Sequence, residues 1–297
     1  MSLVTLSEVL SIAEAEKSAI PAFNIDNLEI PEVIAEVAED LQRPIIFSVG
    51  QGAIKMSGLH SLADIVKDIA NSASIPIALH LDHGISYEQT ISCLREGFTS
   101  VMIDGSSLPL QENIALTKKV SDAAHAVGVS VEAELGAIGG VEDGAACNHA
   151  NLVDIEEVKQ FTAQVKVDAL AIGIGNAHGI YKGKPNLDFE LLQQVKAVNP
   201  PPLVLHGGSG IPGDMIQKAI RLGIRKINIA TEIRLAFLSG IEASVGEKDI
   251  YKMYRSAKQQ VRKLAEDKIR LFSCQNTDHC WEASDCGIYA GNCGKRA

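Results

Sequence analysis

The feature that most restricts the fold is a regular alternation of short apolar runs with amphipathic segments. Eight apolar runs recur, each ending in polar residues or glycine, and they cover residues 20–25, 43–50, 75–84, 98–106, 129–136, 167–175, 201–210 and 224–232. The stretches between them space their apolar residues as amphipathic helices do. Near-continuous apolar runs are typical of parallel strands that are buried on both faces. Eight such units predict an α/β fold, a (β/α)8 TIM barrel of parallel strands.

An open, doubly wound sheet is the structural alternative. That fold carries a glycine-rich dinucleotide fingerprint after its first strand, whereas the first run here is followed by NIDNLE. The chain has 297 residues, enough for one large barrel domain. We predict a single barrel over residues 1–272 and an atypical cysteine-rich tail over 273–297 that is disordered or poorly packed.

The tail holds four of the six cysteines together with His279. Their spacing fits no standard zinc pattern well, so a second metal site is not favoured there. Cytoplasmic thiols are normally reduced, so no disulfide is predicted.

Charge and hydropathy exclude several classes of partner. The formal net charge is −10 and no stripe of Lys and Arg stands out, which argues against nucleic-acid binding. No segment approaches the roughly 18 consecutive apolar residues of a membrane span, and the first residues lack the basic flank of a signal peptide. We therefore expect a cytoplasmic protein with no membrane or nucleic-acid partner. Small phosphorylated ligands remain compatible, because glycine amides and single cations hold them locally.

Three histidines stand at the predicted carboxyl ends of different strands, where TIM barrels carry their active sites. They are His83, His178 and His206, and each is followed directly by glycine. A lone histidine at a strand end is more often structural. Three neutral imidazoles with an open fourth position form a catalytic zinc site in principle. Their convergence on one rim favours a metal site.

Carboxylates accompany these histidines. Asp82 directly precedes His83, and it can act as an acid/base group or orient the imidazole; its spacing does not separate the two roles. His80 lies on the same strand face as Asp82, where we expect a structural or supporting role. Glu132 and Glu134 alternate with apolar residues, so both are expected to face the barrel interior near the metal.

Glycine-rich segments complete the predicted rim. Residues 132–151 begin as a strand and become a long loop that carries Glu142, which predicts a mobile lid with a catalytic base; a solvated acidic loop is the alternative. Glycine-rich turns also follow the sixth, seventh and eighth strands, and Lys182 stands in the first of them. Such turns commonly hold phosphate on backbone amides. Together they predict a phosphorylated substrate.

These motifs, taken in order, resemble a known family. The stretches AFNIDN, HLDHG, VMIDGS, VEAELGAIGGVEDG, NAHGIYKG, LVLHGGSGIP and KINIATE are similar to those of the class II, zinc-dependent ketose-bisphosphate aldolases, and within them to the tagatose-bisphosphate aldolase branch. The resemblance implies a carbon–carbon lyase. Such an enzyme reversibly cleaves D-tagatose 1,6-bisphosphate to dihydroxyacetone phosphate and glyceraldehyde 3-phosphate through a metal-stabilised enediolate.

The resemblance also implies roles for single residues. His83, His178 and His206 bind one Zn2+ per subunit, and Glu134 is an alternate ligand or lies beside the metal. Asp82 exchanges the proton of the C4 hydroxyl, and Glu142 moves the proton of the carbon that becomes the nucleophile. A monovalent cation, Na+ or K+, is expected near the glycines, and the subunits form a homodimer or homotetramer. The residues implied to bind substrate are Asn24, Gly179, Lys182, Gly207, Gly208, Ser209, Asn228 and Thr231.

Three alternatives stay open at this point. Fructose-specific members commonly carry Asp or Asn where this chain has Ala230 in NIAT, so the tagatose branch is favoured over fructose 1,6-bisphosphate by one residue. A Schiff-base aldolase needs an inward lysine, and the eight runs offer only Lys226, toward the start of its strand. The non-enzymatic alternative is a sugar-phosphate-binding or regulatory subunit.

Overall fold

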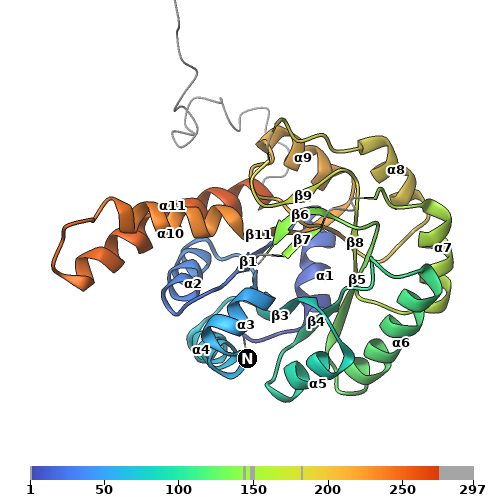
Figure 1. The fold of residues 1–297 in the computed structure, drawn as a ribbon, viewed down its shortest axis with the longest axis horizontal. Helices are drawn as coiled ribbons and strands as arrows, with labels where there is room; N and C mark the ends of the chain where they lie inside the picture. The colour runs from blue at the N-terminus through green and yellow to red at the C-terminus, as the bar shows by residue number, and fades with distance from the viewer. Residues whose placement is uncertain (1, 143–144, 148–150, 182, 274–297) are drawn as a thin grey trace, which may run out of the picture.

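Eight parallel strands close into a barrel with helices around its outside (Figure 1). The computed structural model describes residues 2–142, 145–147, 151–181 and 183–273. Every predicted apolar run contains one barrel strand, which confirms the TIM barrel. The strands in sheet order are β1 (Ile20–Asn24), β11 (Ile224–Ile229), β10 (Leu203–Leu205), β8 (Ala169–Ile172), β5 (Ser130–Leu135), β4 (Ser100–Ile103), β3 (Ile77–Gly84) and β2 (Ile45–Val49).

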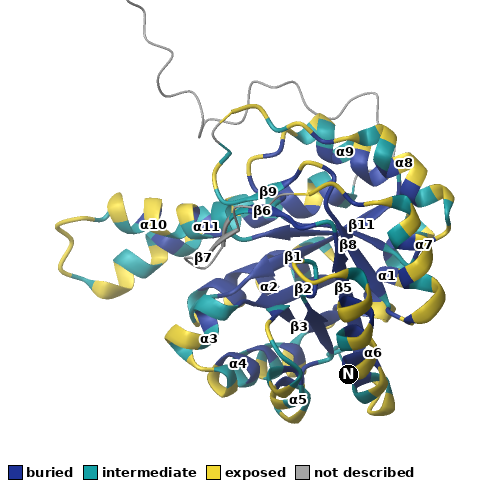
Figure 2. Cartoon of the chain, turned by 45° about the vertical axis from the view of Figure 1, so that its right-hand side comes forward, coloured by how far each residue is buried: buried dark blue, intermediate teal, exposed yellow. Residues whose placement is uncertain are grey.

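The helices turn one apolar face to the strands and a polar face to solvent, as Figure 2 shows by their blue inner and yellow outer sides. Side chains cap several helix starts, because the first backbone N–H groups of a helix have no partner within it. Asp154, for example, accepts from the backbone N–H of Glu156 and Glu157. The helices outside the barrel are α2 (Glu29–Leu41), α3 (Gln51–Ser57), α4 (Leu59–Ser72), α5 (Tyr87–Arg95), α6 (Leu110–Ala126), α7 (Ile155–Gln164), α8 (Phe189–Ala197), α9 (Gly213–Arg221), α10 (Thr231–Glu242) and α11 (Ile250–Ser273).

Helix α1 (Leu6–Glu16) packs against the amino-terminal end of the barrel, where Thr5 and Glu8 form a reciprocal capping box at its start. Its buried face joins inward side chains of the strands in a compact apolar cluster. The members of this cluster are Leu6, Val9, Leu10, Ala13, Ile20, Ala22, Ile46, Ala78, Ala169, Ala171 and Val204. The amino-terminal half of the barrel interior is therefore a packed core, as in other barrels of this class.

A small sheet lies at the opposite end, and the sequence prediction is wrong here. The segment expected as a continuous loop contains β6 (Gly139–Glu142) and β7 (Ala145–Cys147), which pair antiparallel, and β6 also pairs with β9 (Ala177–His178). Glycine disfavours strand conformation on its own, so this sequence reads as a loop. The backbone of β9 supplies the pairing that the local sequence does not predict.

Helices α10 and α11 form a hairpin that projects from the barrel (Figure 1, left). They pack along each other, and α11 continues over α2. No helix in the described part of the chain is long and apolar enough to span a membrane. The predicted tail lies outside the described residues from 274 onward, so the domain boundary at 272 stays a prediction.

Candidate functional site

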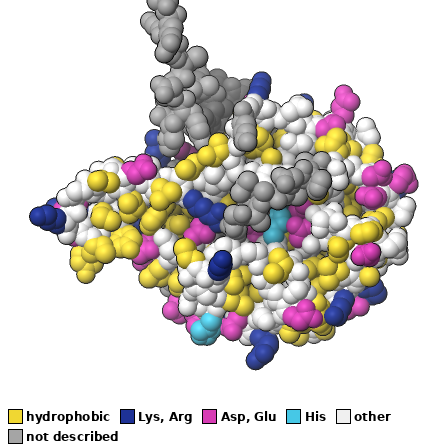
Figure 3. Space-filling model, in the orientation of Figure 1, with side chains coloured by type: hydrophobic (Ala, Val, Ile, Leu, Met, Phe, Trp, Pro, Cys, Tyr) yellow, Lys and Arg dark blue, Asp and Glu magenta, His cyan; other side chains and the backbone are white. Residues whose placement is uncertain are grey.

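The structure brings His83, His178 and His206 together at the carboxyl end of the barrel. Their ring centroids are separated by 5.0 Å for His83 and His178, 4.7 Å for His83 and His206, and 5.9 Å for His178 and His206. One nitrogen from each ring lies within 4.8 Å of the others. In the space-filling view, a histidine near the centre of this face stands beside acidic side chains (Figure 3). The residues converge as predicted from the strand ends.

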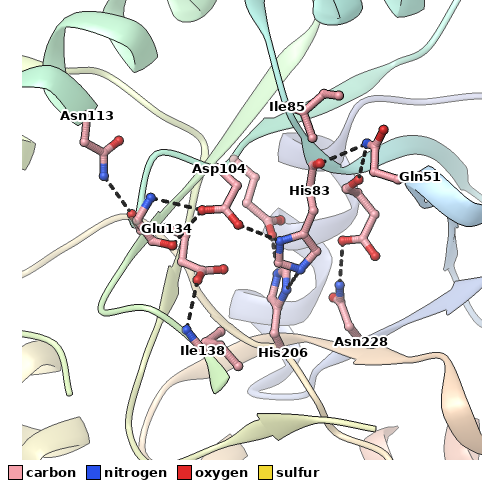
Figure 4. Close-up of polar contacts among 12 residues, drawn as sticks. Gln51, His83, Ile85, Asp104, Asn113, Glu134, Ile138, His206 and Asn228 are labelled. Carbon is pink, nitrogen blue, oxygen red and sulfur yellow. Dashed lines mark hydrogen bonds and ion pairs between the residues drawn. The ribbon is translucent and has the colours of Figure 1, made fainter. Parts of the chain in front are cut away.

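Carboxylates orient two of these rings. His83 Nδ1 lies 2.8 Å from Asp104 Oδ2 (Figure 4). His206 Nε2 lies 2.8 Å from Glu132 Oε1. A carboxylate accepts a hydrogen bond from the N–H of the imidazole nitrogen that it faces, so the opposite nitrogen of a neutral ring carries the lone pair. Those opposite nitrogens, His83 Nε2 and His206 Nδ1, are 2.8 Å apart. Two lone pairs directed at each other need a cation or proton between them, so this donor set fits a metal ion.

Burial disfavours the protonated form of two imidazoles, His206 and His80. Desolvation holds the pKa of His206 well below its usual value, and it does the same for the pKa of His80. A neutral imidazole is the form that binds a metal ion. Burial therefore favours the metal-binding form of His206.

A second group of possible ligands adjoins the first. It consists of His83, Asp104 and Glu134. Burial raises the pKa of Glu134 well above its ordinary value, and its Oε2 has no hydrogen-bond partner among the described residues. Burial opposes ionisation of Asp104 as well, but its hydrogen bonds with His83 and Ser106 outweigh burial and lower the pKa of Asp104. An unpartnered buried carboxylate oxygen beside the histidines is consistent with the expected position of Glu134 near a metal.

Asp82 accepts hydrogen bonds from two asparagines. Asn24 on β1 donates to Asp82 Oδ2 at 2.9 Å, and Asn228 on β11 donates to Asp82 Oδ1 at 3.0 Å. The carboxylate that receives His83 Nδ1 is Asp104. Asp82 is fully buried in the barrel mouth, and its geometry suits a proton-transfer group better than a support for His83.

A charged network lies beneath the histidines. Lys226 Nζ pairs with both Glu132 oxygens at 3.0 and 2.9 Å, and both side chains are fully buried. His80 Nε2 lies 3.8 Å from Glu132 Oε2, and its Nδ1 is 2.8 Å from Ser100 Oγ. Glu132 therefore connects Lys226 to His206. Because Lys226 is engaged by this ion pair below the rim, it is badly placed to form a Schiff base.

A small cavity adjoins His178, and it gathers most of the described residues that were expected to bind phosphate. Helix α10 starts at Thr231 in its wall, and the start of a helix favours anions. Gly208 is not among the lining residues, and its backbone N–H donates to the Asn228 carbonyl at 3.0 Å. The lining residues are His178, Gly179, Gly207, Ser209, Asn228, Ala230, Thr231 and Arg234.

Two expected residues escape description. Lys182 lies outside the described residues. Glu142 is the last residue of β6, and its side chain also lies outside the described part of the structure. Their assigned roles stay predictions.

Sequence reasoning assigned no role to several residues that the structure places at the rim. Arg234 faces the phosphate-side cavity and forms a bidentate ion pair with Asp26 at 2.7 and 2.8 Å. Gln51 donates to the carbonyl oxygen of His83 at 2.9 Å (Figure 4). That carbonyl belongs to a residue with φ of 46°, a left-handed conformation that is uncommon outside glycine. The position of Asp104 at a strand end was a usable signal; nothing local marked Gln51.

Comparisons with known proteins agree with this geometry. Residues 4–277 match the family described as fructose-bisphosphate aldolase class-II. A fructose-bisphosphate aldolase of Thermus caldophilus is 40% identical, over 91% of this chain and 98% of that protein. The YdjI aldolase of Escherichia coli K12 superposes with a TM-score of 0.82 at 32% identity, over 91% of this chain and 97% of that one. A putative fructose-1,6-biphosphate aldolase of Coccidioides immitis gives a TM-score of 0.84 at 28% identity, over 90% and 95%.

Proposed function

Because the chain belongs to the class II fructose-bisphosphate aldolase family, we propose that this lyase cleaves fructose 1,6-bisphosphate reversibly to dihydroxyacetone phosphate and glyceraldehyde 3-phosphate. The observation that carries the proposal is the pair of facing nitrogens of His83 and His206, with His178 beside them. Asp82 stands next to His83 in the chain, and its carboxylate is held in the same mouth by two amides. This arrangement suits metal-assisted proton transfer at a ketone.

The three histidines are the proposed ligands of one Zn2+, with Glu134 beside them. A bound zinc ion would act as a Lewis acid toward the ketose carbonyl. Asp104 and Glu132 orient His83 and His206 through hydrogen bonds of 2.8 Å. Such supporting carboxylates fix the ring tautomer and raise the basicity of the ligand nitrogen.

Asp82 is the proposed acid/base group at the C4 hydroxyl. In the cleavage direction it accepts that proton, the C3–C4 bond breaks, and C4 leaves as the aldehyde carbon while the bonding electrons stay with the dihydroxyacetone phosphate fragment. Glu142 is the proposed donor of the proton that this fragment then takes up at C3. Asn24 and Asn228 hold the Asp82 carboxylate through both oxygens, so its orientation is set before substrate arrives.

The small cavity beside His178 is the proposed phosphate site of the dihydroxyacetone phosphate moiety. Ser209 and Thr231 supply hydroxyl groups there, and Gly179 and Gly207 present backbone without side chains. Lys182 and a monovalent cation, Na+ or K+, are proposed to bind the same phosphate group. Gly208 is a weaker candidate, because Asn228 already accepts its N–H.

Tagatose 1,6-bisphosphate is the second candidate substrate. The observation that favours it is Ala230, which lines the cavity at the position where the fructose-specific pattern has Asp or Asn. The two ketoses differ only in the configuration at C4, the carbon whose hydroxyl Asp82 is proposed to serve. The methyl side chain of Ala230 cannot form a hydrogen bond, so other polar groups of the barrel mouth must distinguish the two configurations at C4.

A coupled assay tests both proposals. Purified protein is given each bisphosphate epimer, with and without a chelator, followed by addition of zinc. We expect turnover on at least one epimer, its loss on chelation and its recovery with zinc, and the ratio of kcat/KM values identifies the preferred substrate. Full turnover by rigorously demetallated protein would contradict the zinc proposal. Zinc binding without turnover on either epimer would favour the sugar-phosphate-binding subunit instead.

We also propose that the chain is a homodimer or homotetramer that assembles through the α10–α11 hairpin. This hairpin projects from the barrel and exposes large apolar side chains, which in a solvated monomer are rarely gathered on one element. Exposed Leu238 is changed to Glu, and light scattering is expected to show a smaller particle than the wild type. A monomeric wild type would contradict the proposal. The exposed residues are Leu235, Leu238, Val245, Ile250 and Tyr251.

The proposed location is the cytoplasm. Sugar bisphosphates are multiply charged and do not cross bilayers unaided, because burying an uncompensated charge in hydrocarbon is costly. Fractionation of cells that express the full chain tests this location.

A further inference from the structure

Two side chains connect the turn that carries His178 to the turn that carries His206. The Tyr181 hydroxyl accepts from the backbone N–H of Ala177 at 2.9 Å and donates to the Gly207 carbonyl at 3.1 Å. Asn176 donates from Nδ2 to the His206 carbonyl at 3.0 Å. Ala177 directly precedes His178, and Gly207 directly follows His206. The third bonded group is the carbonyl of His206 itself.

The two turns also touch through their backbones. Gly207 has φ of 62°, and a Cβ built on it would lie 2.1 Å from the Ala177 carbonyl oxygen. Only glycine permits this approach. Asn176 is 3% exposed, and its Oδ1 accepts from the Ile174 N–H at 2.9 Å. Both polar ends of Asn176 are therefore engaged in the interior, which makes the connection a built contact rather than a surface one.

The hydrogen bonds of Tyr181 and Asn176 lie where strand pairing does little to fix the positions of His178 and His206. β9 has two residues, and it pairs with β6 of the small sheet rather than with a barrel strand. β10 ends at Leu205, one residue before His206. The rings of His178 and His206 have the widest separation of the three pairs, with centroids 5.9 Å apart. Metal sites tolerate only about 0.5 Å of misplacement in their ligands.

We propose that Tyr181 and Asn176 are positioning residues, which hold His178 and His206 at the separation that one metal ion requires. The proposal rests on the zinc site of the proposed function. The Tyr181 hydroxyl ties the residue before His178 to the residue after His206, and Asn176 ties the same segment to His206 itself. The pair links β9 of the small sheet to the barrel turn after β10, and β6, the strand that pairs with β9, ends at Glu142.

The first test is Tyr181→Phe, which removes one oxygen atom and keeps the ring. Zinc affinity is measured by competition with a chelator, and the geometry is followed through the visible absorption bands of the Co2+-substituted protein. We expect zinc affinity to fall about 10- to 100-fold, the range found when outer partners of metal ligands are removed. The cobalt bands should shift or weaken. These readouts do not depend on turnover.

Tyr87→Phe is the matched control, because this tyrosine lies outside the barrel at the start of α5, with Lys119 Nζ 3.7 Å from the centroid of its ring. It should leave zinc affinity and the cobalt spectrum unchanged. Asn176→Asp is the second variant: it keeps the size of the side chain but loses the amide donor to the His206 carbonyl. It should change both readouts in the same direction, and it replaces the first variant if Tyr181→Phe does not fold by circular dichroism.

The outcomes separate this proposal from the proposed function. If wild-type protein binds no zinc and its turnover resists chelation, the zinc site itself is wrong. If wild type binds zinc while Tyr181→Phe and Asn176→Asp bind it equally tightly, with wild-type cobalt spectra, the positioning role is overturned. A lowered melting temperature of the metal-free variants with unchanged zinc affinity would also overturn it, because that pattern indicates a structural role alone.

Discussion

The two ends of the barrel interior are built from the same strands with opposite chemistry. Near the amino ends, the inward side chains are small and apolar, such as Ala22, Ala78 and Val204, and α1 packs against them. Two residues further along stand Asn24 and His80 on their strands and His206 just past the end of β10, all buried. Side chains two apart point to the same face of a strand. The change from packed core to polar site therefore occurs over about 7 Å.

The difference shows how the barrel separates stability from chemistry. The apolar end buries side chains without leaving polar groups to satisfy. The polar end contains buried atoms without hydrogen-bond partners among the described residues, and such atoms are costly unless a ligand engages them. These include Asn24 Oδ1, Ser48 Oγ, His80 Nε2, Glu134 Oε2 and Asn228 Oδ1. The apolar end stabilises a fold that can carry an unfavourable site at its other end.

The largest expected effect comes from the polar end. Asp82→Asn removes the proposed proton acceptor while leaving all three histidines, so turnover should fall about 10²- to 10⁴-fold with zinc content unchanged. A coupled assay and metal analysis check the two halves of this expectation. Asp122→Asn, on the exposed face of α6, is the matched control and should retain activity. Wild-type turnover in Asp82→Asn would remove Asp82 from the mechanism.

Lys226→Met tests whether the polar end also contributes to stability. The change leaves the Glu132 charge buried without its cation, which should lower the free energy of unfolding by about 3–5 kcal/mol. Denaturant unfolding of the metal-free protein measures it. In the double variant Lys226→Met with Glu132→Met, the free energy of unfolding should return toward the wild-type value. Its zinc affinity should be lower than that of wild type, because His206 has lost its carboxylate. Wild-type zinc affinity in the double variant would contradict the supporting role of Glu132.

Leu10→Ala tests the apolar end. Leu10 is 1% exposed in α1, so its truncation leaves a cavity and should lower the free energy of unfolding by about 2–5 kcal/mol. At a temperature where the variant is folded, kcat and zinc affinity should equal those of wild type. A changed kcat would mean that the two ends are mechanically coupled.

The smallest effect is expected outside both ends, at His60 on α4. Its hydrogen bond to Glu96 and the nearby Asp64 charge raise the pKa of His60. This stabilisation is therefore fully present below the ordinary histidine pKa of about 6.5 and is lost as pH rises through the raised value. His60→Gln should slightly lower the melting temperature at pH 5.5 and leave it unchanged at pH 9. A difference of equal size at both pH values would contradict the ion pair.

Site residues that are marked by their own local sequence could be predicted, whereas contacts between residues far apart in the sequence could not. The three histidines could be found because each ends a strand-like run and precedes glycine. The contacts that support them could not, even for Asp104 with its visible place at a strand end, since Asp104 is 21 residues from His83, Gln51 is 32 residues from it, and Tyr181 is 26 residues from Gly207. Contacts over such distances depend on how neighbouring strands are staggered. The relative stagger of neighbouring strands cannot be predicted from a single sequence.

The sequence by itself determined the eight strands, their order and the residues that reach the barrel mouth, because hydrophobic periodicity and turn residues act locally. Only the tertiary structure decided that Asp104, rather than adjacent Asp82, holds the His83 ring. It also decided that residues 139–142 and 145–147 contribute strands to a small sheet. The physical reason is the same in both cases: a hydrogen bond selects its partner by distance and angle across the barrel, and neighbours in sequence often point elsewhere.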